Sequence, residues 1–427
     1  MRHITSARAL EKTRLTLGFV ALADCAPLVA AVELGLFAKQ GLDVRLQRQA
    51  SWAAIRDNVA IGRLDGAQML AGLPLAATLG HGTAPVPMLT GLALGANGNS
   101  ITLDAGLSQR MAELDVGRPG SAPASAETLA RVVAADRDAG LAPMTFAMVH
   151  PVSSHHYQLR YWLASGGLDP DRDVRLIVVP PARMLANLRA GRIAGYCVGA
   201  PWSEAAVAEG IGHVAITGHE LWNNAPEKVF GVARDWAEVY PNTHRAVLCA
   251  LLEACIWLDE PKHRERIAPH VAGAGFVDCD AAQLAAVYAG HIRRQREAAI
   301  EWHPDHLVFA RHQSNFPWRS HAVWFLRQMQ RWGQLHPATD VHAVAAAVYR
   351  PELYREVCAE LERPAPVVDY KTEGRHGQAW SDVTLGADIT LGPDRFFDGG
   401  TFDPMVAAPR VHGAGPSRAH ILEGGLQ

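Results

Sequence analysis

The sequence contains few cysteines and no long apolar segment. Its 427 residues include 6 cysteines, and no two of them form a Cys-x-x-Cys pair. Isolated cysteines in a chain of this length are expected to be free thiols, buried as small apolar side chains. A stretch of about 18 apolar residues without charge, which a transmembrane helix requires, is also missing. We therefore expect no disulfide framework and no membrane-spanning segment.

An excess of charge of one sign is missing as well. The chain has 40 basic and 43 acidic side chains, which gives a formal net charge of −3. It has no long run of like charges, so direct binding of nucleic acid or of a membrane surface is not expected. Hydrophobic residues make up 49% of the chain and charged residues 19%, which is typical of a folded protein. The length predicts two or more lobes.

The common motifs of enzymes are absent too. The chain has no Gly-x-x-x-x-Gly-Lys-Ser/Thr loop, no Gly-x-Gly-x-x-Gly and no Gly-x-Ser-x-Gly. His150, His155 and His156 are close in sequence, but their spacing does not place two imidazoles on one helical face with a glutamate between them. Ser153 and Ser154 are better read as a helix N-cap than as partners of His155 in catalysis. We expect no catalytic residue, no cofactor and no metal site.

Residues 15–70 predict a parallel α/β unit. Apolar runs typical of strands alternate with amphipathic segments typical of helices, in the order 15–23, 26–39, 44–46, from Ser51 onward, and 67–70. Ligands of such sheets bind outside the carboxyl ends of the strands. Asp24, Ser51 and Trp52 fall at these ends, so this unit indicates where a ligand binds.

A second strand–helix group follows. Strands are expected at 144–150, 174–179 and 193–198, with helices at 153–164 and 184–190 between them. Residues 241–361 read as helical, and the chain after residue 367 is rich in Gly, Pro and Asp and is expected to be extended.

Three residues each have both a functional and a structural interpretation. Trp52 either offers its indole N–H to a ligand or is a core aromatic. Lys228 is either a binding residue or, as its local sequence favours, a solvated loop lysine. Gly199 either leaves backbone N–H groups free for an anion or simply permits a tight turn.

Several segments together resemble one family. They are LGFVALADCAPLVAAVELGLFAKQGLDV, ASWAAIRDNVAIGRLDGAQMLAGLPLAATLG, RYWLASGGLDP, CVGAPW, APEKVFGV and RFFDGGTFDP. In this order they resemble the nitrate- and bicarbonate-binding branch of ABC-transporter solute-binding proteins. The resemblance implies an α/β, two-lobed, periplasmic-binding-protein-like (type II) fold with a helical C-terminal half. It places lobe 1 at 15–94 and 222–405, lobe 2 at 95–221, and a flexible tail at 406–427.

The resemblance also implies the ligand-binding residues. In nitrate-binding members a Trp, a Gln, a His, a Gly and a Lys surround the anion, and the matching positions here are Trp52, Asn99, His155, Gly199 and Lys228. Asn99 replaces the glutamine of the family's Asn-Gly-Gln and is one methylene shorter. The family's Gly-Glu-Pro-Trp is Gly-Ala-Pro-Trp in this chain, so that glutamate is absent.

This residue set favours nitrate or nitrite over bicarbonate. Nitrate is a planar monoanion that only accepts hydrogen bonds, and its burial requires a positive charge and several N–H donors. The five residues supply such a set without a carboxylate. Bicarbonate carries a hydroxyl that needs an acceptor, and its binders have an acidic residue near the position of Lys228.

The resemblance leaves location and partner open. Charged residues interrupt every apolar window before residue 15, so no signal peptide is visible and a cytoplasmic location is expected. That favours the cytoplasmic nitrate/nitrite sensors of this family, which hold an RNA-binding antiterminator protein of nitrate assimilation until the anion binds. The alternative is the periplasmic binding component of an ABC transporter, with the transporter permease as partner. A remote alternative is an enzyme similar to a thiamin-precursor synthase.

Overall fold

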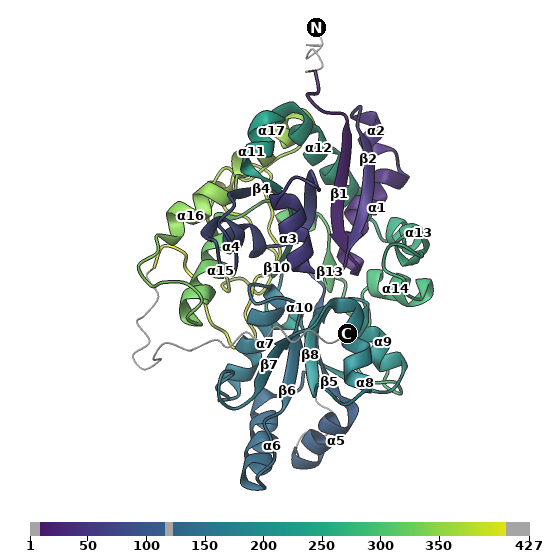
Figure 1. Ribbon diagram of the computed structural model, residues 1–427, viewed down its shortest axis with the longest axis vertical. Coiled ribbons are helices and arrows are strands. Elements are labelled where there is room, and N and C mark those ends of the chain that lie inside the picture. The colour runs from purple at the N-terminus through teal and green to yellow at the C-terminus, as the bar shows by residue number, and fades with distance from the viewer. Residues whose placement is uncertain (1–8, 116–122, 407–427) are drawn as a thin grey trace.

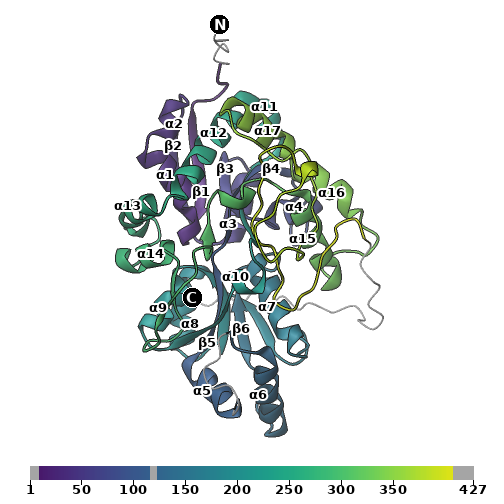
Figure 2. The same ribbon diagram turned by 180° about the vertical axis from the view of Figure 1, so that it is seen from behind.

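Two β-sheets, one above the other in Figure 1, form the framework of the molecule. The computed structural model describes residues 9–115 and 123–406. The upper sheet has six strands in the order β13-β4-β10-β3-β1-β2, and the lower sheet has five in the order β7-β6-β8-β5-β9. Helices pack around both sheets, and the two views from opposite sides show the same two-storey arrangement (Figure 2).

The predicted α/β unit at the start of the chain is confirmed. Strand β1 (Arg14–Val20) pairs in parallel with both β2 (Asp43–Gln49) and β3 (Gly66–Leu70). The other elements of the first 97 residues are η1 (Ala23–Cys25), α1 (Ala26–Glu33), α2 (Leu36–Lys39), α3 (Trp52–Ala60), α4 (Leu73–Leu79) and β4 (Met88–Asn97). The hydroxyl of Ser51 caps α3 by accepting a bond from the Ala54 backbone N–H at 3.2 Å.

The lower sheet is built from the second strand–helix group. Its elements are β5 (Asn99–Asp104), α5 (Ala105–Leu114), α6 (Ala126–Asp138), β6 (Thr145–Met148), α7 (Ser154–Ser165), β7 (Arg175–Val178), η2 (Pro181–Arg183), α8 (Met184–Arg189), β8 (Gly195–Gly199), α9 (Trp202–Ala208), β9 (Gly212–Thr217) and α10 (Gly218–Leu221). Ser153 caps α7 as the sequence predicts, since its side chain accepts a bond from the His156 backbone N–H at 3.0 Å.

The chain passes between the sheets at two places near the middle of the molecule. Strand β4 of the upper sheet ends at Asn97, and β5 of the lower sheet begins at Asn99. The chain returns through α10 to β10 (Pro226–Ala233), which runs antiparallel between β3 and β4. The expected lobe boundaries at 94/95 and 221/222 stay a prediction, as does the assignment of 222–405 to lobe 1.

The expectation that 241–361 is entirely helical is wrong. The helices are α11 (Arg234–Val239), α12 (Pro241–Leu258), α13 (Pro261–Ala272), α14 (Ala281–Tyr288), α15 (Arg319–Arg331), α16 (Val341–Val348) and α17 (Pro351–Glu360). Between α14 and α15 lie β11 (His291–Arg293), β12 (Ile300–Trp302), β13 (Leu307–Val308) and η3 (Arg311–Gln313). Strands of two or three residues are too short to show a period-2 pattern in sequence.

The segment after α17 is extended, as expected, apart from η4 (Val383–Leu385). It runs down the molecule as the yellow trace beside α15, passes close to α7 and then turns back upward (Figure 2). The backbone N–H of Phe397 donates to the Leu221 carbonyl at 3.0 Å, and Phe396 packs on Trp222. The segment therefore contacts Leu221 and Trp222, which follow the last strand of the lower sheet. The expected tail at 406–427 lies, after its first residue, outside the described residues.

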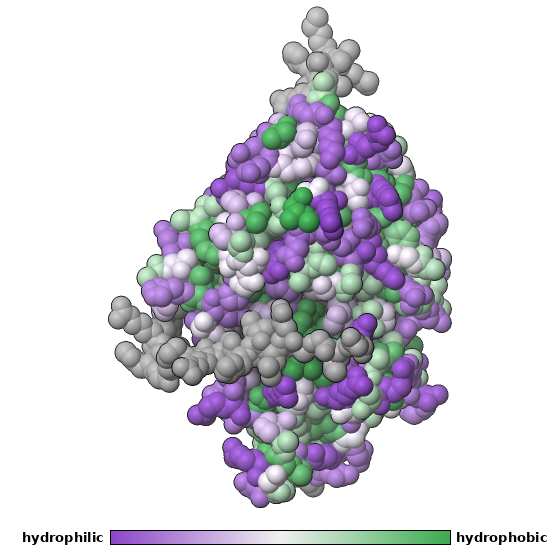
Figure 3. Space-filling view, viewed as in Figure 1, coloured by the Kyte–Doolittle hydropathy of each residue, from purple (hydrophilic) through white to green (hydrophobic). Residues whose placement is uncertain are grey.

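Apolar side chains fill the interior. On the face shown in Figure 3, hydrophilic side chains are spread over the regions of both the upper and the lower sheet. All six cysteines are free, and only Cys279 is partly exposed. Within the described ranges, no helix combines the length and the apolar character needed to cross a membrane.

Candidate functional site

The candidate site lies where the two sheets meet. The upper sheet contributes Asp24 in η1, just after β1, Trp52 at the first position of α3, and Lys228 in β10. The lower sheet contributes Asn99 at the start of β5 and His155 in the first turn of α7. Residues from strands, and from helices that follow strands, in both sheets thus meet in one buried cluster.

Lys228 is the positive charge of this cluster. Its side chain is 1% exposed, and its Nζ lies 2.8 Å from Asp24 Oδ2 and in contact with Glu227 Oε1. The same ammonium lies 5.3 Å from the centre of the Trp52 ring, within the range of a cation–π interaction. Lys228 is therefore a buried, paired cation and not a solvated loop residue.

Glu227 is the most heavily hydrogen-bonded group in the cluster. Asn99 Nδ2 donates to Glu227 Oε2 at 2.7 Å, and the Ser154 hydroxyl donates to the same oxygen. His155 Nε2 lies 2.7 Å from Glu227 Oε1, which Lys228 also contacts. One carboxylate from the upper sheet is thus held by three side chains from the lower sheet.

The charged groups of the cluster shift one another's pKa values. Burial raises the pKa of Glu227, but the Lys228 charge and the contacts with His155 outweigh burial and hold the pKa well below its usual range. Burial lowers the pKa of Lys228, but Asp24 and Glu227 outweigh this and raise it. For Asp24 burial is the stronger influence, so its pKa is raised despite Lys228. Lys228 and Glu227 therefore form an ion pair at neutral pH.

Three buried polar atoms in the cluster remain available to a ligand. Among the described residues, Trp52 Nε1, His155 Nδ1 and Asn99 Oδ1 have no hydrogen-bond partner. An unpaired buried N–H is costly, and an acceptor that reached Trp52 Nε1 would remove that cost. The first turn of α7, next to Glu227, also carries the positive end of the helix dipole. The indole N–H and the helix dipole favour a negatively charged ligand.

Gly199 lies at the end of β8, directly opposite Asn99 in the lower sheet. A Cβ at this position would lie 3.4 Å from Asn99 Oδ1 and 3.4 Å from Leu22 Cδ2. The glycine therefore leaves room beside Asn99 and next to the upper sheet.

The structure brings together the five residues expected from the resemblance, but the expected absence of a carboxylate is wrong. Glu227 and Asp24 both contact Lys228. Asp24 could be found from sequence because it follows the first strand. Glu227 could not, because neighbours in a regular strand point to opposite faces. Pairing of β10 with β4 is irregular at Pro226, Lys228 and Val229, and this irregularity lets Glu227 and Lys228 face the same cluster.

The two neighbouring histidines, His150 before α7 and His156 within it, serve the fold. His156 Nδ1 lies 2.6 Å from the Pro151 carbonyl, and its Nε2 accepts a bond from Arg160 Nε at 2.7 Å. Burial lowers the pKa of both His150 and His156 to about 3, so both are neutral. His155 alone of the three contacts Glu227, so the histidines do not converge on a common point.

One group of possible metal ligands occurs elsewhere among the described residues. Glu220, Glu301 and His303 have ligand atoms within 4.8 Å of one another. Arg294 already pairs with both carboxylates, at 2.6 Å from Glu220 Oε1 and 2.8 Å from Glu301 Oε1. A guanidinium between the carboxylates neutralises them and opposes binding of a cation.

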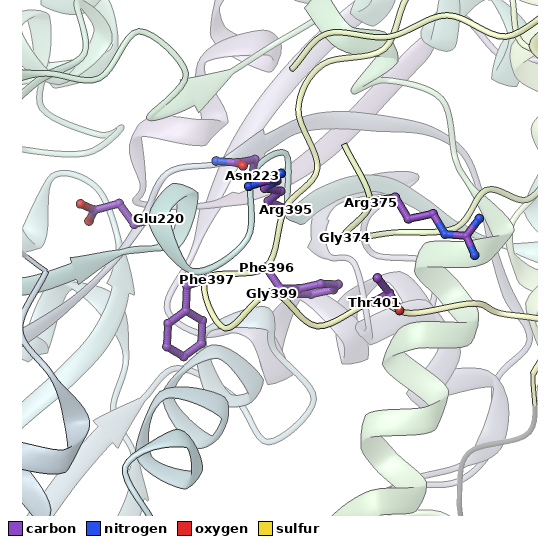
Figure 4. A pocket seen from close by; sticks show the side chains of 9 residues that line it. All are labelled: Glu220, Asn223, Gly374, Arg375, Arg395, Phe396, Phe397, Gly399 and Thr401. Carbon is purple, nitrogen blue, oxygen red and sulfur yellow. The ribbon is translucent and has the colours of Figure 1, made fainter. Parts of the chain in front are cut away.

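A surface cavity lies apart from the buried cluster. It has a volume of about 620 Å³ and lies beside the extended C-terminal segment. Its lining is Glu220, Asn223, Gly374, Arg375, Arg395, Phe396, Phe397, Gly399 and Thr401. Figure 4 shows the charged ends of Glu220 and Arg375 pointing away from each other. The cavity thus lacks the converging polar groups that mark a specific binding site.

The chain matches a protein-family model. The model of the NMT1-like family matches residues 8–272. The nitrate import ATP-binding protein NrtC of Synechocystis is 42% identical over 357 residues, which are 83% of this chain and 51% of NrtC. The chain therefore spans about half the length of that relative.

Two further relatives match over nearly the whole chain. The bicarbonate-binding protein CmpA of Synechococcus elongatus is 30% identical over 421 residues, covering 93% of this chain and 86% of CmpA. The crystal structure of the periplasmic nitrate-binding protein NrtA from Synechocystis is 31% identical and superposes with a TM-score of 0.81, covering 93% of this chain and 97% of NrtA. The expected periplasmic-binding-protein-like fold is confirmed. These relatives are described as binding and transport proteins, not as enzymes.

Proposed function

The chain belongs to the NMT1-like family, and we propose that it binds nitrate or nitrite in the buried cluster between its two sheets. The observation that carries this proposal is the position of Lys228. It is a fully buried ammonium beside Trp52 and His155, which come from both sheets, and it contacts Glu227, to which Asn99 donates. A flat monoanion needs one such charge and several N–H donors around it. The names of NrtA and NrtC, which mention nitrate, support the same ligand.

Bicarbonate is a second candidate because of the two carboxylates. Glu227 and Asp24 can accept a hydrogen bond from a hydroxyl group, which nitrate and nitrite do not have. The name of CmpA supports bicarbonate in the same way as that of NrtA supports nitrate.

Isothermal titration calorimetry of the purified chain with nitrate, nitrite and bicarbonate tests the proposal. We expect saturable binding of nitrate or nitrite with one site per chain. Sulfate, a dianion, serves as the control, because a single ammonium balances only one negative charge. Absence of heat with all three monoanions would contradict an anion-binding function.

We further propose that the protein acts in the cytoplasm as a sensor, and that anion binding alters its affinity for an RNA-binding antiterminator. The alternative is a component of an ABC transporter, and the name of NrtC, a nitrate import protein, supports that role. For either role, the partner must discriminate between the anion-free and the anion-bound form. Co-purification with the antiterminator should be observed without nitrate and lost in millimolar nitrate. Co-purification that does not respond to nitrate would reject the sensor role.

A further inference from the structure

Glu227 occupies the hydrogen-bond donors that a bound anion requires. Its carboxylate accepts bonds from Asn99 and Ser154 and contacts His155 and Lys228, while its side chain is 2% exposed. A bound oxyanion would draw on the same ammonium and N–H groups. The carboxylate of Glu227 and a bound anion therefore compete for one set of donors.

The charges of the cluster leave no surplus for an incoming anion. Lys228 already pairs with the carboxyl groups of both Asp24 and Glu227. A monoanion would add a negative charge to a buried region, where a charge without a partner is strongly disfavoured. Binding therefore needs either a gain of positive charge or a loss of negative charge.

The other groups that contact Glu227 offer no positive charge that is free to pair with the anion. On α7, His155 contacts the carboxylate and Ser154 is neutral; Asn99 of β5 is also neutral. From β8 the thiol of Cys197 faces Glu227, and burial raises its pKa, so it is neutral too. A proton from solvent is the remaining source of charge.

We propose that Glu227 is an internal competitor of the anion, and that each oxyanion binds together with one proton taken from solvent. The proton adds to the Glu227 carboxylate, which then becomes a neutral carboxyl group and releases Lys228 to the anion. The net charge of the cluster is unchanged, because one negative ion and one proton enter together. This inference rests on the proposed anion-binding function. It makes Glu227 a determinant of how affinity depends on pH.

The low pKa of Glu227 is consistent with this coupling. The pKa is low because Lys228 and His155 stabilise the carboxylate against burial. An anion that takes over these two partners removes that stabilisation, so burial then dominates and the carboxylate gains a proton. Uptake of one proton on binding makes the dissociation constant rise about tenfold for each unit of pH.

Calorimetry on the unmodified chain tests the coupling. Sodium nitrate is titrated at pH 7.5 in phosphate and in Tris, whose ionisation enthalpies differ, and the difference in binding heat gives the number of protons taken up. We expect about one proton per nitrate, and an affinity about 100-fold higher at pH 6.5 than at pH 8.5. Nitrate binding without proton uptake would overturn the inference.

Two substitutions test the role of Glu227 itself. In Glu227→Gln and Glu227→Ala, bound nitrate replaces the missing negative charge, and Lys228 keeps its 2.8 Å pair with Asp24. Both variants should bind nitrate at least about tenfold more tightly than the original chain at pH 8.5, with no proton uptake. Circular dichroism and the unfolding midpoint establish that each variant is folded, and the buffer experiment needs no substitution.

Glu373→Gln is the matched control. Glu373 is also a fully buried carboxylate, and it too contacts a lysine, a serine and a histidine, which are Lys371, Ser320 and His321. None of these residues belongs to the cluster around Lys228. The variant should keep the original nitrate affinity and the original proton uptake.

The results separate this inference from the proposed function. Weaker nitrate binding by a folded Glu227→Gln variant would make Glu227 a binding residue and overturn the inference, while anion binding itself stands. Loss of bicarbonate binding alone in that variant would make Glu227 an acceptor for a hydroxyl, which also overturns it. Failure of the original chain and of both variants to bind any of the three monoanions would overturn the proposed function.

Discussion

At the scale of single residues, the site depends on the balance of three buried charges. Lys228 pairs with both Asp24 and Glu227, and His155 also contacts Glu227. Removing one partner of a buried ion pair leaves the other charge without compensation. The lysine is therefore expected to matter both for the ligand and for the fold.

Lys228→Met tests this double role. We expect nitrate affinity to fall by two to four powers of ten, because loss of a buried charged contact costs about 3–5 kcal/mol. We also expect a lower free energy of unfolding, with a smaller loss at pH 5 than at pH 8, because the stranded carboxylates become protonated at low pH. Calorimetry and urea unfolding measure the two effects. Native nitrate affinity in this variant would exclude Lys228 from the site.

At the scale of elements, the start of α9 carries a buried acid outside the site. Both carboxylate oxygens of Glu204 are buried without a hydrogen-bond partner among the described residues, and His306 Nε2 lies 3.9 Å away. Burial raises the pKa of Glu204 from 4.5 to about 7. Burial lowers the pKa of His306 to about 3, so this imidazole is neutral and does not compensate the carboxylate.

Glu204→Gln should therefore stabilise the protein at alkaline pH. Because the folded pKa lies above the unfolded one, the stabilisation from the protonated acid is complete below about pH 4.5 and is lost as the pH rises through 7. A shift of this size corresponds to about 3 kcal/mol. The free energy of unfolding of the variant, relative to the original chain, should rise by about that amount between pH 4.5 and pH 8. A pH-independent difference in urea unfolding would show that Glu204 does not titrate in this range.

Some of the secondary-structure elements could be predicted from the sequence, and others could not. The strands and helices of residues 15–70 were predictable because their apolar periodicity is regular, and the N-caps Ser51 and Ser153 mark the starts of α3 and α7. The hairpin of β11 and β12 was missed because three residues per strand carry too little pattern. Glu227 was missed because an irregular pairing of β10 with β4 decides which way it faces, and no local sequence pattern encodes that pairing.

The residues that meet in the site were predictable only through the family resemblance. Asn99, His155 and Lys228 lie far apart in sequence, and their contacts depend on how the two sheets stack. Local sequence alone favoured an exposed Lys228, whereas the structure buries it in β10. Long-range packing, which periodicity does not report, therefore determines the site.

At the scale of the whole molecule, two strand connections and the C-terminal segment link the sheets, and the loop after β11 also reaches β9, where the Val214 N–H donates to the Arg294 carbonyl at 2.8 Å. The chain crosses between Asn97 and Asn99 and again between Leu221 and Pro226, and the C-terminal segment packs Phe396 and Phe397 against Tyr161 of α7. A ligand that binds residues of both sheets is expected to favour the form in which the sheets lie close together.

Small-angle X-ray scattering tests this expectation. The radius of gyration should decrease when nitrate is added to the original chain and should not change for Lys228→Met. The control is sodium sulfate at equal ionic strength. An unchanged radius of gyration at saturating nitrate would show that binding does not bring the two sheets together.

A crystal structure of the protein grown in nitrate tests the central claim most directly. We predict a planar, three-lobed density within hydrogen-bond distance of Lys228 Nζ, Trp52 Nε1 and His155, with the Glu227 carboxyl group displaced from Lys228. Nitrate found only at other places, with Lys228 still paired to Glu227 and Asp24 as it is here, would contradict the account.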